Sequence, residues 1–96
     1  PAGAVNIVHL VDWATNSSVK IGGERIAKLV EVYGTKALIT PDIKAILLQV
    51  TTVYKLNPAT VSTNDVIAEA IKFDMVLGRP ANPEEAIALI EEAGLG

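Results

Sequence analysis

Apolar residues recur at intervals of three and four along most of this chain, the spacing that places side chains on one face of an α-helix. From Ala4 to about Ser18 this spacing predicts a first helix, which weakens at the polar residues after Ala14. The alternative for Val5 to Val11 is a strand, because alternate residues of that run would share one face. Both faces of such a strand would be largely apolar, so we expect a helix.

Glycine and proline mark the boundaries of the next two helices. Gly22 and Gly23 break the pattern, and a second helix is predicted to follow, with four inward residues: Ile26, Leu29, Val30 and Tyr33. Gly34 is predicted to end this helix as a left-handed cap, or else to lie inside a longer helix. The run Thr40-Pro41-Asp42 supplies a capping hydroxyl, a proline at the first helical position and an acid in the first turn. A third helix is therefore predicted from Pro41 to about Tyr54, with inward residues Ile43, Ile46, Leu47, Val50 and Tyr54.

Capping signals also predict two helices in the last third of the chain. After a loop that starts near Leu56, Ser62 or Thr63 is expected to cap a fourth helix, which stops at Gly78. Asn82-Pro83-Glu84-Glu85 starts a fifth helix by the same logic, and Gly94 ends it. About five helices with short connections predict an all-α fold, a compact single-domain bundle over residues 1–96.

Half of the residues are apolar, which is a high share for a small domain with much surface relative to its interior. Some apolar side chains should stay uncovered in the monomer, and large exposed apolar patches usually mark contact sites. We therefore expect either a protein partner or a homo-oligomer. The alternative is a core unusually rich in Ala, Val and Ile.

The charges exclude several classes of partner. The 8 basic residues are scattered among 11 acidic ones, and only four residues are aromatic, so neither a basic stripe nor a stacking surface for nucleic acid is predicted.

Cysteine is absent, which fits a reducing cytoplasm and removes disulfides and thiolate metal sites. No apolar run approaches the roughly 20 residues of a membrane-spanning helix, and no signal-peptide layout is present. The start at Pro1 is consistent with a fragment of a longer protein.

Few side chains offer reactive chemistry. His9 is the only histidine, so neither a zinc site nor a Ser-His-Asp triad is expected. We expect His9 to be a half-buried structural residue, with Asp12 one helical turn away. The glutamates of the fifth helix are interpreted as a solvated face, or alternatively as an acidic edge for a basic partner. Gly22-Gly23 lacks the pattern of a phosphate-binding loop. We therefore predict no catalytic, cofactor-binding or metal-binding residues, no small-molecule substrate and no enzymatic activity; the enzyme alternative is limited to His9, Asp12 or those glutamates.

One spaced set of residues points to a known family. Gly22 follows Trp13 by nine positions, then come Ile26, Val30 and Tyr33, and six positions after Tyr33 the segment Ile39-Thr40-Pro41-Asp42-Ile43. From about Leu10 to Leu48 this spacing resembles the conserved domain of the archaeal flagellar (archaellum) accessory proteins D and E. Asn82 to Gly94 is a weaker match to the closing helix of that family.

The resemblance implies a non-enzymatic cytoplasmic scaffold at the base of the archaellum motor, which links chemotaxis adaptor proteins to the motor. Four residues are predicted to serve partner binding or the core: Trp13, Tyr33, Leu38 and Ile39. The leading hypothesis is thus a helical protein-protein interaction module for motility and chemotaxis. The alternative is a self-assembling structural domain whose apolar surface is a homo-oligomer interface.

Overall fold

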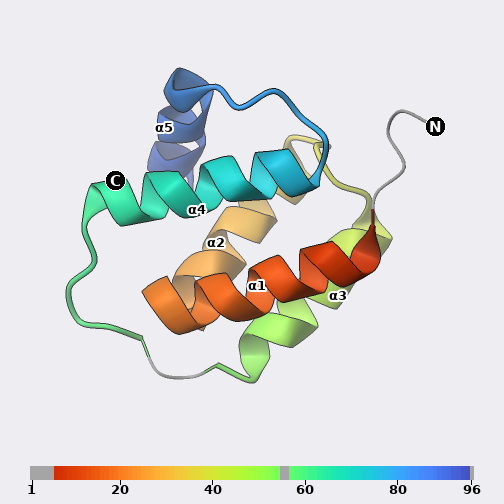
Figure 1. Cartoon of the computed structure of the whole chain (residues 1–96), viewed down its shortest axis with the longest axis horizontal. Coiled ribbons are helices and arrows are strands. Elements are labelled where there is room, and N and C mark those ends of the chain that lie inside the picture. Colours follow the sequence, from red (N-terminus) through yellow and green to blue (C-terminus); the bar gives the residue numbers. More distant parts are fainter. Residues whose placement is uncertain (1–5, 55–56, 96) are drawn as a thin grey trace.

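Five α-helices make up most of residues 6–54 and 57–95, which are the residues described in the computed structural model (Figure 1). They are α1 (Ile7–Ile21), α2 (Gly23–Thr35), α3 (Pro41–Thr52), α4 (Thr63–Val76) and α5 (Pro83–Glu92). No strand occurs within this described part, so the all-α fold class is confirmed and the strand alternative is wrong for residues 7–11. Ala4 and Val5, where that helix and that strand were predicted to begin, lie outside the described residues.

The helices surround one core. α1 and α4 run side by side in opposite directions across the face seen in Figure 1, with α2 behind them. α3 packs against α1 and α2, and α5 packs against α4 and α2. The Cα radius of gyration is 12.1 Å, and about 12 to 13 Å is expected for one compact domain of this length.

The predicted capping residues start three of the helices. The Thr40 hydroxyl accepts a hydrogen bond from the Ile43 amide at the start of α3. The Ser62 hydroxyl accepts one from the Asp65 amide at 3.1 Å, which starts α4. Asn82 caps α5 through two amides of its first turn. The three predicted helix starts are therefore confirmed, each by the side chain that satisfies an otherwise unpaired N–H group.

The two glycines between α1 and α2 are required by the backbone. Gly22 has a φ of +97°, and a Cβ on Gly23 would clash with the Tyr54 carbonyl oxygen at the end of α3. Gly22 offers no side chain to cap α2, and the Asn57 side chain supplies the cap instead, accepting from the Glu24 amide at 3.1 Å. The predicted break is confirmed, and its cap comes from a loop more than thirty residues away in sequence.

Several predicted helix ends are wrong. α1 continues to Ile21, beyond Ser18, because Ser17 and Ser18 face the protein interior. Gly34 is not a left-handed cap; it lies inside α2, which agrees with the alternative of a longer helix. The left-handed residue is Ala37, which lies two residues beyond the end of α2 and has a φ of 58°. The Leu38 amide donates back to the Tyr33 carbonyl and so closes the last turn of the helix.

Helix α3 also differs from its prediction. It ends at Thr52 instead of Tyr54, and Ile46, which was predicted to face inward, is 38% exposed. Leu47 and Thr51 are the buried residues of α3. Ile43 and Val50, which were also predicted to face inward, are partly buried against the core, so within α3 the predicted inward face is wrong only at Ile46.

Three aromatic side chains join α1, α2 and α4 in the core. The Trp13 and Phe73 rings are stacked with centroids 3.9 Å apart and an interplanar angle of 6°. The Tyr33 ring also contacts Phe73, with centroids 4.4 Å apart and a tilt of 34°. All three side chains are buried, so Phe73 connects α4 to both other helices.

We predict that Phe73→Ala lowers the free energy of unfolding by about 3 to 5 kcal/mol, the usual effect of truncating a buried aromatic ring. Met75→Ala on the same helix is the control: this side chain is 65% exposed, and surface changes usually cost less than about 0.5 kcal/mol. Urea denaturation of both variants measures the difference. Equal losses in the two variants would contradict a core centred on Phe73.

Candidate functional site

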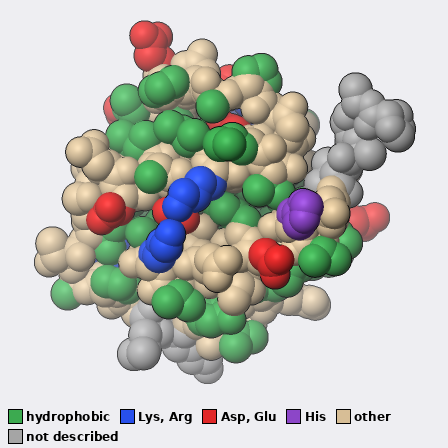
Figure 2. Space-filling view, viewed as in Figure 1, with side chains coloured by type: hydrophobic (Ala, Val, Ile, Leu, Met, Phe, Trp, Pro, Cys, Tyr) green, Lys and Arg blue, Asp and Glu red, His purple; other side chains and the backbone are tan. Residues whose placement is uncertain are grey.

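A groove runs along the surface between α1 and α4, with a volume of about 390 Å³. Figure 2 shows this face, where positively charged side chains lie among apolar ones. The residues that line it come from both helices: His9, Asp12, Trp13, Asn16, Ser17 and Lys20 from α1, and Glu69, Lys72, Met75 and Val76 from α4. We call it the α1–α4 groove.

The floor of the α1–α4 groove is held by two hydrogen bonds between its helices and by one within α4. The Trp13 indole N–H donates to the Glu69 carbonyl oxygen at 2.9 Å. The Ser17 hydroxyl donates to Glu69 Oε1 at 2.7 Å, and Lys72 Nζ donates to Glu69 Oε2 at 3.2 Å. Glu69 is only 4% exposed, so these bonds compensate for the burial of its carboxylate. The groove therefore has a fixed floor.

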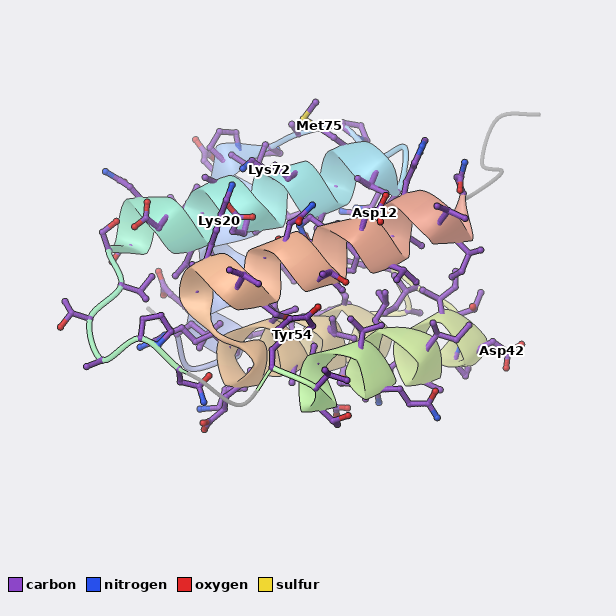
Figure 3. All side chains as sticks on the ribbon, turned by 60° about the horizontal axis from the view of Figure 1, so that its bottom comes forward. Asp12, Lys20, Asp42, Tyr54, Lys72 and Met75 are labelled. Carbon is purple, nitrogen blue, oxygen red and sulfur yellow. The ribbon has the colours of Figure 1, made fainter. Side chains whose placement is uncertain are left out.

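Two lysines lie over one end of the groove. Figure 3 shows Lys20 of α1 and Lys72 of α4 reaching toward one another. Their amines lie close together, and the ion pair with the Glu69 carboxylate raises the pKa of Lys72. Lys72 is therefore protonated at neutral pH. With Lys20 it forms a positively charged end that Glu69 neutralises only in part.

The other end of the groove is different in character. Asp12 lies at this end, on α1, and the exposed Met75 side chain lies across from it on α4 (Figure 3). His9 is exposed, so its predicted half-buried role is wrong: it sits in the first turn of α1, where the core does not cover it. Among residues 6–54 and 57–95 no side-chain hydrogen bond joins His9 to Asp12.

The four predicted partner or core residues do not form one surface. Trp13, Tyr33 and Ile39 are buried, with at most 7% of each exposed, and their observed roles are in the core. Leu38 is half-buried and lines a separate groove against α5, together with Lys36. Only Trp13 reaches the α1–α4 groove, as part of its floor. Contact of these four residues with a partner stays a prediction.

Sequence reasoning missed the residues that give the groove its charge. Lys20, Glu69 and Lys72 are each unremarkable in the sequence, because single charges on helices are usually solvated. One indication that Glu69 is buried was present: it lies four residues before Phe73, which places both on the inward face of α4.

A second polar cluster fixes the connection between α4 and α5. The Tyr33 hydroxyl donates to Asp74 Oδ1 at 2.7 Å, and Arg79 Nε donates to the same oxygen at 3.2 Å. Arg79 also pairs with Glu85 of α5. Asp74 is fully buried, and burial together with the hydrogen bond and charge of Asp74 raises the pKa of Tyr33 well above its ordinary value. The phenol is therefore held neutral, which suits a structural hydrogen bond.

The described residues contain no group of three histidine, aspartate or glutamate side chains placed to hold a metal ion. None of the described helices combines the length and the apolar character needed to cross a membrane.

Comparison of the chain with protein-family models, with curated proteins and with solved structures found no match. The resemblance of residues 10–48 to the archaellum accessory family therefore stays a prediction.

The raised pKa of Tyr33 predicts a loss of stability in alkali. As the pH rises above about 10, the unfolded chain loses this proton first, while the folded protein keeps it. The stabilisation is thus complete below pH 10 and falls by up to about 1.4 kcal/mol per pH unit above it. Urea unfolding from pH 9 upward should show a steeper fall in the wild type and in Tyr54→Phe than in Tyr33→Phe, which keeps only the contribution of other groups such as Lys72. The same slope in all three proteins would contradict the assignment.

Proposed function

We propose that this chain is a non-enzymatic protein-protein interaction module and that its α1–α4 groove holds a helical segment of another protein chain. The observation that carries the proposal is the composition of the groove: a fixed floor that contains Trp13 and Glu69, an exposed Met75 and a lysine pair that one carboxylate neutralises in part. Rigid floors lower the entropic cost of binding, and methionine adapts to apolar side chains of a partner. Helices commonly dock in grooves of this kind.

The ionisable groups of the groove favour binding over catalysis. A lysine that acts as a base or nucleophile needs a lowered pKa, whereas the pKa of Lys72 is raised. Glu69 has both carboxylate oxygens engaged in hydrogen bonds to Ser17 and Lys72. These groups support the reading that the groove holds a ligand without changing it.

The finer proposal rests on the resemblance stated for residues 10–48. If it is a true kinship, the module is a cytoplasmic scaffold that links chemotaxis adaptors to the archaellum motor. A helical chain with a docking groove is compatible with such a role, and its partners would be proteins, with neither nucleic acid nor a small-molecule substrate involved.

The second candidate is a self-assembling structural domain. It is favoured by large apolar side chains that are at least 38% exposed on the described surface: Ile7, Val8, Val19, Ile46, Val53, Met75 and Ile87. Exposed apolar residues on several helices suit an interface between copies of the chain.

Co-purification from the native organism with substituted bait proteins tests the proposed function. Met75→Asp places a charge at the groove and should abolish capture of the partner, while Val53→Asp, at a somewhat more exposed position outside the groove, should retain it. Circular dichroism confirms that both variants are folded. Mass spectrometry should find motor or adaptor proteins with the wild type and with Val53→Asp. Equal capture by both variants, or no captured protein at all, would contradict the proposal.

A further inference from the structure

The α1–α4 groove sets clear requirements for the helix that occupies it. The groove holds two lysines, Lys20 and Lys72, and two carboxylates. One of these, Asp12, lies at the opposite end, so a second carboxylate beside Glu69 would balance the charge at the lysine end. Met75 lies three residues after Lys72 on the same helix and offers an exposed apolar contact. A complementary helix would therefore carry a carboxylate and an apolar side chain about one turn, or 5 Å, apart.

Helix α5 presents this pattern on its exposed surface. Glu84, Ile87 and Glu91 follow one another at spacings of three and four, which places them on one stripe of the helix. Ile87 is 40% exposed, and both glutamates are exposed. Within the described part of the chain neither of these two carboxylates takes part in an ion pair, whereas Glu85 and Glu92 of α5 do.

The α5 stripe cannot fill the groove of its own molecule. Ile87 and Glu91 line a different hollow, against Thr63 and Ile67 at the other side of α4. α5 packs on α4 and α2 and makes no substantial contact with α1. Any contact between stripe and groove must therefore join two molecules.

We propose that α5 of a second copy of this chain occupies the α1–α4 groove, with Glu84 or Glu91 at the Lys20–Lys72 pair and Ile87 against Met75. This inference rests on the proposed function of the groove as a docking site. Each copy offers one groove and one stripe on different surfaces, so the contact is head to tail and continues from copy to copy. One ten-residue helix in one groove is a small interface, so the association is weak and sensitive to salt.

Charge exchange between the two surfaces tests the inference. The groove variant combines Lys20→Glu with Lys72→Gln. Glutamine is used at position 72 so that no second carboxylate lies directly beside Glu69. The stripe variant combines Glu84→Lys with Glu91→Lys. Asp42→Lys on α3, which changes an exposed charge away from both surfaces, is the control. Circular dichroism establishes that each protein is folded before its association is measured.

Sedimentation equilibrium over a range of concentrations at low salt gives the result. The wild type and the Asp42→Lys control should form larger species as concentration rises, and each double variant alone should be a monomer. An equimolar mixture of the two double variants should associate again, because each groove then meets a stripe of opposite charge. The inference would be overturned if the wild type stays monomeric, or if both double variants associate as strongly as the wild type. If Met75→Asp still loses a captured partner while the wild type is monomeric, the proposed function stands and only the head-to-tail contact fails.

Discussion

The packing of Phe73 against Trp13 and Tyr33 is the interaction on which the rest of this structure depends. Buried tryptophan and tyrosine need partners for their polar atoms, and both find them on α4. The Trp13 indole reaches the Glu69 carbonyl, and the Tyr33 hydroxyl reaches the Asp74 carboxylate. A shift of α4 by one residue would break both bonds together with the ring contacts. α4 therefore has a single register against α1 and α2.

This register creates the α1–α4 groove. It brings Glu69 beside Ser17, buries the carboxylate and leaves Lys72 to reach across to Lys20. Two neighbouring ammonium groups repel each other, so their approach costs free energy unless carboxylates offset it. The aromatic packing of the core offsets this cost, because it holds α1 and α4 side by side despite the repulsion between the two lysines. The result is a surface whose charged groups are positioned by the packing of the core.

Local signals made most of the fold predictable, and long-range register made the groove unpredictable. Three helix starts could be predicted because the capping side chain bonds to backbone N–H groups only a few residues away; the caps are Thr40, Ser62 and Asn82. The left-handed turn at Ala37 could not be predicted, because alanine is not a residue that favours this conformation. Its cost is only about 1 to 2 kcal/mol, and the hydrogen bond from the Leu38 amide to the Tyr33 carbonyl stabilises the turn. The charged end of the groove joins positions 20 and 72, and nothing in either local sequence indicates that the two meet.

Hydrogen exchange at the Trp13 indole N–H, followed by NMR, tests the central claim most directly. Because this proton is donated to the Glu69 carbonyl beneath the aromatic contact, exchange should require global unfolding. The predicted result is an indole proton as strongly protected as the slowest backbone amides of α4. An indole proton that exchanges rapidly while those amides stay protected would show that α4 folds without the Trp13 contact, and would contradict the account.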